Sequence, residues 1–424
     1  MSPYLRYGPH WLVTLVISVC AIPSKSQADD WARFRGPNGT GQSAVTGLPL
    51  KWTESDYRWK KKLAGSGSSA PVIWGNRLFV TSCNTETAEI FVQCLDATSG
   101  KQLWETRFQS KPYRIHRRNS YASSTPVVDG DHVYVTYASP QHTYLVALDH
   151  QGKEVWRRDF GRWVSMHGFG ASPMIHRDKV VLINSQQADK LPADATPGSS
   201  RAIAVDRLTG KDVWATKLGT TTANYSVPCV FSLDGRDQLI ACSSAEGFFS
   251  LDPDSGEFNW KMPAFRMRTV ASPVLEGNLI LGSTGSGGGG NYLVAAQIGD
   301  QGAKKLYEVN QSANYVPSPI VCNGLVFLFS DKGIASCVDA NSGEVMWKKR
   351  IAKGFSGSPV ASATHIYVMD EAGGVVVLAA SRDFEEPAVN PLGEGSRSTP
   401  AIANGCLFFR TDTQLFCLES TATD

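Results

Sequence analysis

The sequence has almost no net charge and, beyond its N-terminus, no long apolar run. Its 424 residues carry 41 basic and 39 acidic side chains. Removal of residues 1–28, which hold two of the basic residues and no acid, balances the two signs. A chain with no net charge exerts no long-range attraction on nucleic acid or on an anionic membrane. No later segment has the roughly 18 unbroken apolar residues of a membrane-spanning helix, so we expect neither a nucleic-acid partner nor a transmembrane anchor after cleavage.

The motifs of haem and metal sites are also absent. No Cys-x-x-Cys-His segment occurs, which excludes covalently attached haem, and no two cysteines are adjacent. The eight histidines are scattered, and none stands at metal-ligand spacing from another His, Cys or acid. Zinc sites need such clusters, so we expect no metal site.

The first 28 residues have the features of an export signal. An apolar run from Trp11 to Ile22 is followed by Ser26-Gln27-Ala28, which places small residues at the two positions that determine cleavage. We expect cleavage before Asp29 and a periplasmic or secreted protein. The alternatives are a retained anchor and lipidation of Cys20, although Val19 occupies a position where lipidation normally requires a small residue.

A short element recurs along the rest of the chain: a small residue, proline, and two or three apolar residues. Successive prolines of this element are 40 to 55 residues apart. That spacing is the length of four short strands with their turns, which is one blade of a β-propeller. The prolines are Pro71, Pro126, Pro173, Pro228, Pro273, Pro319, Pro359 and Pro400.

Five of the eight units end in a second element, Asp-x-x-Ser/Thr-Gly-x-x-x-Trp or a slightly shorter version of it. It runs from Asp96 to Trp104 and recurs in three further units, with a version one residue shorter from Asp149 to Trp156. The acid and the hydroxyl favour a tight turn, and the glycine supplies its positive φ. The tryptophan follows on the outer strand, where its large apolar surface can join neighbouring blades. The expected blade-docking residues are Trp59, Trp104, Trp156, Trp214, Trp260 and Trp347.

The two elements together resemble the repeat of the pyrroloquinoline-quinone (PQQ) enzymes. That repeat is found in quinoprotein dehydrogenases and in the propeller subunit of the bacterial outer-membrane protein assembly machine. The resemblance covers residues 59–420 and implies an all-β fold, an eight-bladed propeller of four-stranded antiparallel blades. It is specific for the fold and says little about function, because the motif docks blades together.

The last repeat has only three strands, and the N-terminal segment offers the missing one. Residues 57–63 have the pattern of an outer strand without a blade of their own. We expect this strand to close the ring, which removes exposed sheet edges; an open or seven-bladed ring is the alternative. The expected domains are a signal peptide (1–28), a lead-in with the ring-closing strand (29–64) and the propeller (65–424), which we expect to be monomeric.

Eight cysteines remain after cleavage, and the sequence leaves their oxidation state open. Cys94, Cys337 and Cys417 occupy equivalent third-strand positions, where other repeats have Ala or Ser. A small buried side chain fits all of these positions, which favours packing cysteines. Bridges such as Cys83–Cys94 or Cys406–Cys417 are the alternative in an exported protein.

The segments before the repeat prolines are expected to ring one mouth of the central channel, where propellers commonly bind ligands. These segments are rich in cations, amides and tyrosines, with Arg117 and Arg118 among them, and poor in carboxylates. Such a mouth suits an anionic or polyhydroxylated ligand. The candidate ligand-binding residues are Arg114, His116, Asn119, Tyr121, His167, Asn224, Tyr225, Arg268, Asn314, Tyr315 and Arg397. The glycine run Gly287–Gly290 is interpreted as a flexible hairpin loop, because no helix follows it.

Two functions remain in competition. The first is a non-enzymatic binding or scaffold module of the cell envelope, with an envelope protein or a small ligand as its partner. The second, which the resemblance implies, is a PQQ-dependent alcohol or sugar dehydrogenase. Such enzymes hold calcium beside the quinone with a Glu and an Asn and use an Asp as base, and many carry a vicinal disulfide. This sequence lacks the vicinal cysteines and shows no acids placed for those roles. We therefore favour the binding module, with no catalytic residue and no cofactor firmly expected.

Overall fold

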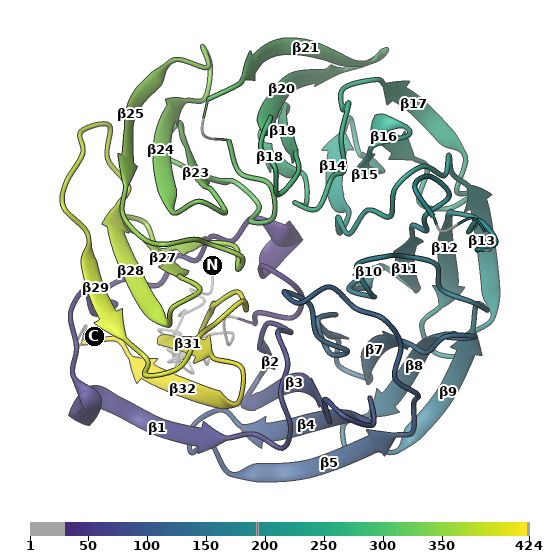
Figure 1. Ribbon diagram of the computed structural model, residues 1–424, viewed down its shortest axis with the longest axis horizontal. Helices are drawn as coiled ribbons and strands as arrows, with labels where there is room; N and C mark the ends of the chain where they lie inside the picture. Colours follow the sequence, from purple (N-terminus) through teal and green to yellow (C-terminus); the bar gives the residue numbers. More distant parts are fainter. Residues whose placement is uncertain (1–29, 192, 194, 312, 422–424) are drawn as a thin grey trace, which may run out of the picture.

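The computed structural model describes residues 30–191, 193, 195–311 and 313–421. The expected signal peptide, residues 1–28, lies outside this range. Within it, eight four-stranded antiparallel sheets stand around a central axis like the blades of a propeller (Figure 1). The eight-bladed fold expected from the repeat spacing is therefore confirmed. No helix of the described part is long and apolar enough to cross a membrane.

Blades are numbered here in chain order, each from the strand nearest the axis to the outermost one. Blade one has β2 (Val72–Trp74), β3 (Arg77–Cys83), β4 (Ile90–Asp96) and β5 (Gln102–Phe108). Blade two has β6 (Val127–Val128), β7 (His132–Ala138), β8 (Thr143–Asp149) and β9 (Glu154–Asp159). Blade three has β10 (Met174–His176), β11 (Lys179–Asn184), β12 (Arg201–Asp206) and β13 (Asp212–Lys217). Blade four has β14 (Cys229–Leu233), β15 (Arg236–Ser243), β16 (Gly247–Leu251) and β17 (Phe258–Met262).

The second half of the ring repeats the same order. Blade five has β18 (Val274–Glu276), β19 (Leu279–Thr284), β20 (Tyr292–Gly299) and β21 (Gly302–Val309). Blade six has β22 (Ile320–Cys322), β23 (Leu325–Phe329), β24 (Ile334–Asp339) and β25 (Val345–Arg350). Blade seven has β26 (Val360–Ala361), β27 (His365–Met369), β28 (Gly374–Ala379) and β29 (Ala388–Pro391). Blade eight has β30 (Ala401–Ala403), β31 (Cys406–Arg410), β32 (Gln414–Glu419) and, outermost, β1 (Tyr57–Lys62).

The apolar core lies between blades rather than on one side of a sheet. The second strands are buried along most of their length, and β23 is buried throughout, in the run Leu325–Phe329. Continuous burial arises because each blade is covered on both faces by its neighbours, so a short uninterrupted apolar run is the pattern that fits. One core cluster joins Val72 and Phe79 of blade one to Val133 and Val135 of blade two. The outer strands are largely exposed and polar, as in β25.

The third and fourth strands share one register in every blade except the seventh. A small residue of the third strand stands opposite the aromatic residue of the fourth, and a β-bulge follows immediately. The pairs are Cys94 with Trp104, Ala147 with Trp156, Ala204 with Trp214, Ser250 with Trp260, Ala295 with Tyr307, Cys337 with Trp347 and Cys417 with Trp59. The eight described cysteines are free and buried. They are packing residues, and the alternative bridges Cys83–Cys94 and Cys406–Cys417 are not formed.

The tryptophans contact the turn of the next blade. Trp104 donates its indole N–H to the carbonyl oxygen of His150 at 2.8 Å, and the Trp59 indole reaches the carbonyl of Ala97 at 2.9 Å. Trp156, Trp214 and Trp347 bond the carbonyls of Arg207, Pro253 and Ser381 in the same way. Trp260 differs, because the tight hairpin between β20 and β21 lacks the Asp-x-x-Ser-Gly turn. Its indole instead donates to the Gln238 side chain of its own blade.

The motif glycine completes this contact from the other side. Gly100 has φ +68°, and a Cβ atom there would lie 2.6 Å from the Trp59 ring. Both the backbone conformation and the close approach of the indole therefore require glycine. The Ser/Thr-Gly and the Trp of the repeat are thus two halves of one contact between neighbouring blades.

The N-terminal strand closes the ring, as expected. β1 pairs antiparallel with β32, and Trp59 stands opposite Cys417. Before it, the lead-in segment (residues 30–56), with two short 3₁₀ turns, η1 (Pro37–Gly39) and η2 (Glu54–Asp56), crosses the middle of the ring (Figure 1). Backbone bonds join Trp31 to Ile73 of blade one and Ser43 to Ala361 of blade seven. The lead-in therefore ties together blades that are far apart in the sequence.

Candidate functional site

A belt of hydroxyl groups surrounds the central axis at the residue before each repeat proline. The backbone N–H of this residue donates to the side-chain hydroxyl of the same position in the next blade. A residue before proline is held in an extended conformation, which keeps its N–H directed at the neighbouring blade. Six such bonds, each 2.9 Å long, join Ala70 to Thr125, Thr125 to Ser172, Val227 to Ser272, Ser272 to Ser318, Ser318 to Ser358 and Ser358 to Thr399. The belt is interrupted where the accepting position is Ala70 or Val227, which have no hydroxyl.

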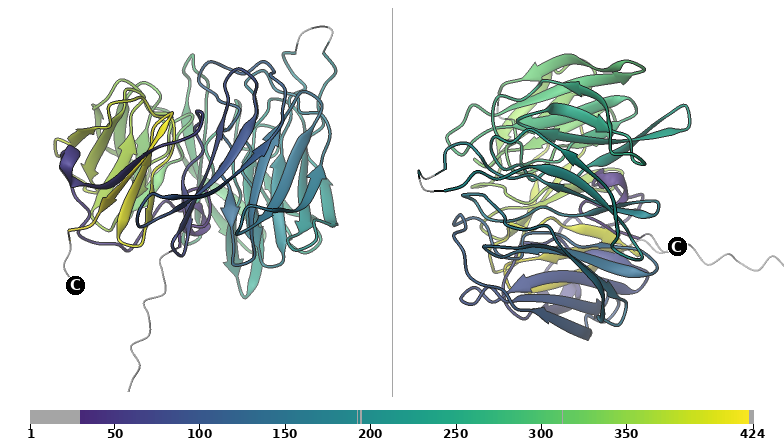
Figure 2. Two further views of the ribbon diagram at one scale, coloured as in Figure 1. Left: turned by 90° about the horizontal axis from the view of Figure 1, so that it is seen from below. Right: turned by 90° about the vertical axis from the view of Figure 1, so that its right-hand side faces the viewer.

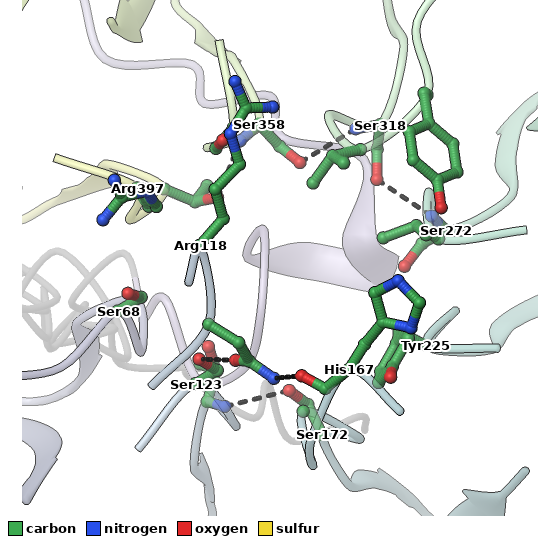
Figure 3. Close-up of a pocket in the computed structure, with 18 of the residues that line it drawn as sticks. Ser68, Arg118, Ser123, His167, Ser172, Tyr225, Ser272, Ser318, Ser358 and Arg397 are labelled. Carbon is green, nitrogen blue, oxygen red and sulfur yellow. Dashed lines mark hydrogen bonds between the residues drawn. The ribbon is translucent and has the colours of Figure 1, made fainter. Parts of the chain in front are cut away.

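An axial cavity of about 300 Å³ lies on this belt. All the belt hydroxyls line it, together with Arg118 and Phe34 (Figure 3). Seven of the eleven candidate ligand-binding residues also line it: His116, Asn119, His167, Tyr225, Arg268, Tyr315 and Arg397. The glycine run forms the hairpin loop between β19 and β20, as interpreted from the sequence, and Gly287 faces the cavity.

Four candidates do not line the cavity. Asn224 and Asn314 are buried, and their amides support loops: Asn224 accepts from the Thr269 hydroxyl at 2.7 Å, and Asn314 donates to Ser283 Oγ at 2.6 Å. Each precedes a tyrosine that does line the cavity, and adjacent residues of an extended segment project to opposite sides. Tyr121 donates its hydroxyl to the carbonyl of Tyr113 at 2.9 Å. Arg114 is exposed to solvent.

Sequence reasoning missed Phe34 and the belt. The belt residues were recognised as part of the repeat, but the repeat pattern alone gives no sign that their hydroxyls face a cavity. Recurrence of Ser or Thr at six of eight equivalent positions was the available signal, since apolar packing would not by itself require a hydroxyl. Phe34 had no such signal, because it lies in the lead-in and reaches the cavity only through the path of that segment.

Three arginine side chains line the cavity, each from a segment that precedes a repeat proline and that is called a blade entry here. Arg268 places Nη1 within 2.8 and 3.0 Å of the two ring nitrogens of His167. Arg118 lies 3.5 Å from Glu371. In the described part of the chain, neither Arg268 nor Arg397 has a carboxylate within ion-pair distance, and the Nε of each is buried without a hydrogen-bond partner.

Two histidines stand beside this cluster although they are distant in sequence. The rings of His116 and His167 have their centroids 5.2 Å apart. Burial, and then the positive charges of Arg268, His116 and Arg114, lower the pKa of His167 to about 4. Burial together with Arg117 and Arg118 also lowers the pKa of His116. His167 is therefore neutral near pH 7 and offers a lone pair to the Arg268 guanidinium. The described residues contain no group of three or more His, Cys, Asp or Glu placed to hold a metal ion.

The lead-in segment forms the floor beneath the cavity and carries two buried cations. Arg33 donates to the carbonyl of Pro228 at 2.6 Å, and Arg35 donates to that of Pro319 at 2.8 Å, so both bind the carbonyls of repeat prolines. Burial lowers the pKa of Arg33 to about 10 and that of Arg35 to about 9. Neither guanidinium has a carboxylate partner among the described ion pairs, and Arg35 leaves Nε and Nη1 without a hydrogen bond. The floor is thus positively charged.

The lining can bind a ligand but does not fit a calcium–quinone pair. Calcium needs several oxygen ligands, normally including carboxylates, and a general base must accept a proton. The residues that line the cavity include no Asp or Glu. Glu371, the acid nearest to Arg118, also accepts a hydrogen bond from Ser356 at 2.5 Å. We therefore derive no catalytic step through such a group.

The docking motif, the eight-bladed ring and the axial cavity define a PQQ-like repeat β-propeller. The model of one family, described as outer membrane protein assembly factor BamB, matches residues 88–349 and 317–422. The chain belongs to this family.

Two relatives show how distant the similarity is. BamB of Yersinia pestis is 22% identical over 318 residues, which cover 74% of this chain and 66% of that protein. BamB of Escherichia coli K12 is 24% identical over 160 residues, or 35% and 39% of the two chains. The match therefore spans less than two thirds of the length of these relatives.

Solved structures agree in fold. BamB from Moraxella catarrhalis has a TM-score of 0.59 at 15% identity, with 85% of this chain and 98% of that one covered. The quinohemoprotein alcohol dehydrogenase from Comamonas testosteroni has a TM-score of 0.65 at 14% identity, with 93% and 81% covered. At such identities these likenesses establish the fold alone, which both a scaffold and an enzyme share.

Proposed function

We propose that this chain is an exported, non-enzymatic binding propeller of the cell envelope that takes part in assembling outer-membrane proteins. The observation that carries the proposal is the match to the assembly-factor family from residue 88 to residue 422, which covers most of the ring. The apolar run and cleavage site of residues 1–28 support export. A closed ring of eight complete four-stranded blades supports a monomer that presents its surface to partners.

The composition of the cavity favours binding over catalysis. Its lining offers guanidinium, hydroxyl and phenol groups but no carboxylate, so it has donors for a ligand and no acid to serve as base for an alcohol. We propose the mouth as a site for an anionic or polyhydroxylated small ligand, beside the surface that docks an envelope protein.

Two long loops build the docking surface at this mouth. Residues 109–121 are held to the neighbouring blade entry, where Asn119 Nδ2 donates to the carbonyl of His167 at 2.7 Å. The described residues of the loop between β11 and β12 project beyond the blades (Figure 2). This loop is anchored near its base, where the N–H of Gln187 donates to the carbonyl of Val164 at 2.9 Å. Exposed loops on a rigid frame are the usual carriers of recognition.

The proposal is tested by depleting the protein in its own host and measuring folded outer-membrane β-barrel proteins. We expect their levels to fall and to be restored by the full chain but not by a chain without residues 2–28, which is not exported. A photo-crosslinker at exposed Arg117 or Lys190 should trap a component of outer-membrane protein assembly. Unchanged β-barrel levels on depletion would contradict the proposal.

A titration with PQQ and Ca²⁺ tests the competing enzyme function. We expect no stabilisation of the purified exported protein and no dye-linked oxidation of alcohols or sugars. Turnover in this assay would overturn the non-enzymatic assignment and make the channel mouth an active site.

A further inference from the structure

We propose that the axial cavity binds a small organic dianion whose two oxyanion groups, carboxylates or phosphates, lie at opposite sides of the channel. The inference narrows the small-ligand part of the proposed function and rests on the mouth being a binding site. It follows from four features of the cavity: unpaired arginines, hydroxyl groups with free protons, a charged floor and the separation of the cations.

The first feature is cationic charge without a counterion. Arg268 and Arg397 have no carboxylate partner in the described part of the chain, and their Nε atoms are buried without hydrogen bonds. Burying an unpaired charge or an unsatisfied donor costs free energy. An anion in the cavity would supply both missing interactions, since guanidinium groups bind carboxylates and phosphates with paired N–H donors.

The second feature is that the belt hydroxyls have protons to donate, in addition to the N–H groups of the arginines. A hydroxyl has one proton and two lone pairs. In the belt, one lone pair of each hydroxyl accepts the N–H of the preceding blade, as Ser272 does from Val227. The protons of the six belt hydroxyls have no acceptor among the described residues. The Asn119 amide already has partners: its Nδ2 donates to the carbonyl oxygens of His167 and Phe169, and its Oδ1 accepts a hydrogen bond from Ser123. An oxyanion needs donors alone, and the hydroxyl protons together with the guanidinium groups supply them.

The third feature is the positive charge of the floor that the lead-in segment forms beneath the cavity. Phe34 closes the cavity from below, and the buried cations Arg33 and Arg35 lie on either side of it in the chain. Positive charges in a low-dielectric setting raise the potential of the cavity above them. A cavity of about 300 Å³ suits a small molecule.

The fourth feature is where the cations stand. Arg118 and Arg397 lie on one side of the cavity, and His167 lies on the other (Figure 3). Arg268 contacts His167 and therefore belongs to that second side. Two separated cationic groups favour a ligand with a charge at each end over one with a single charge.

The experiment measures binding of succinate, glutarate and adipate to the purified exported protein by calorimetry and thermal melting at constant ionic strength. Butyrate and 1,4-butanediol are the singly charged and neutral comparators. We expect saturable binding of at least one dicarboxylate with a rise in Tm, weaker binding of butyrate and none of the diol. Arg268→Gln and Arg397→Gln should each weaken dicarboxylate binding at least about tenfold. The exposed Arg236→Gln should leave it unchanged.

Folding of the variants is checked without ligand. Because Arg397 makes no hydrogen bond in the described structure and its Nε is buried without a partner, Arg397→Gln should leave Tm unchanged or raise it. The inference is overturned if none of the dicarboxylates binds, if the diol binds equally well, or if the cavity variants bind like the wild type. The depletion experiment uses the wild-type chain and does not depend on these binding measurements, so failure of this inference is distinct from failure of the proposed function.

Discussion

Arg35 in the lead-in segment donates a hydrogen bond to the carbonyl oxygen of Pro319, 284 residues further along the chain. Pro319 is the repeat proline of blade six, and its carbonyl faces the axis. Through this bond, and that of Arg33 to Pro228, a segment outside the repeats holds two non-adjacent blades. The segment thus both delivers the closing strand and forms the floor of the cavity.

Trp59 should be essential for ring closure. It is buried, stands opposite Cys417 and packs on Phe408, with the ring centroids 6.1 Å apart. We expect Trp59→Ala to lower the free energy of unfolding by about 3 kcal/mol or more, as for other buried aromatic residues. Leu103→Ala, on the exposed side of an outer strand, is the control and should change it by less than about 0.5 kcal/mol. Equal urea midpoints for the two variants would contradict a closing role for β1.

The motif glycine can be tested against a glycine with similar φ and no close neighbour. Gly75 has φ +53° and nothing within 4 Å of a Cβ atom, whereas a Cβ at Gly100 would overlap the Trp59 ring. We expect Gly75→Ala to cost about 1 kcal/mol, the cost of a left-handed conformation. Gly100→Ala should cost clearly more, because the indole must also move. Equal costs in urea unfolding would mean that the packing contact contributes nothing.

The hydroxyl belt predicts that two substitutions change the stability of the protein in opposite directions. Thr125→Val removes the acceptor of the Ala70 N–H, and a buried donor left without a partner costs about 1–3 kcal/mol. Val227→Thr places a hydroxyl where the Ser172 N–H has none to bond, and should stabilise by about 0.5–1 kcal/mol. Urea unfolding of both variants measures these effects. Destabilisation by Val227→Thr would show that the interruption at blade four is required by packing.

His167 should make the stability of the folded protein decrease as the pH falls into the acid range. Its pKa is about 4 in the folded protein and 6.5 without perturbation, so between these values the unfolded chain binds more protons than the folded one. The stability contributed by neutral His167 is therefore complete above about pH 6.5 and is lost as the pH falls towards 4. His167→Gln should lose less stability between pH 7 and pH 4.5 than the wild type does. In an Arg268→Gln background, His167→Gln should change the pH dependence of stability less. Identical pH profiles of stability for His167→Gln and the wild type would refute this account.

The thiols should all be reactive once the protein unfolds. All eight described cysteines are free, so a thiol count on denatured, unreduced exported protein should return eight. A count of six or fewer would reveal bridges formed after export. The cross-strand neighbours Cys406 and Cys417 would be the first pair to examine by peptide mapping.

The ring itself was predictable from the sequence because its determinants are local. The turn from Asp96 to Trp104 needs only its own side chains and one left-handed glycine. The recurrence of the proline element at blade length indicates the number of blades. The closing role of Trp59 followed from an unpaired strand pattern at one end of the chain and a missing strand at the other.

The cavity was predictable only in part, because its composition depends on which way each side chain points. Asn224 and Tyr225 are adjacent in the sequence, yet the amide supports a loop and the tyrosine lines the channel. The contact of His167 with Arg268, 101 residues apart, exists only because the ring brings the entry to blade three close to the entry to blade five. Sequence alone thus determined the repeat and its closure, which arise from turn chemistry and strand pattern. The tertiary structure decided the site, since ring geometry selects which polar residues face the axis and leaves two arginines there without a counterion.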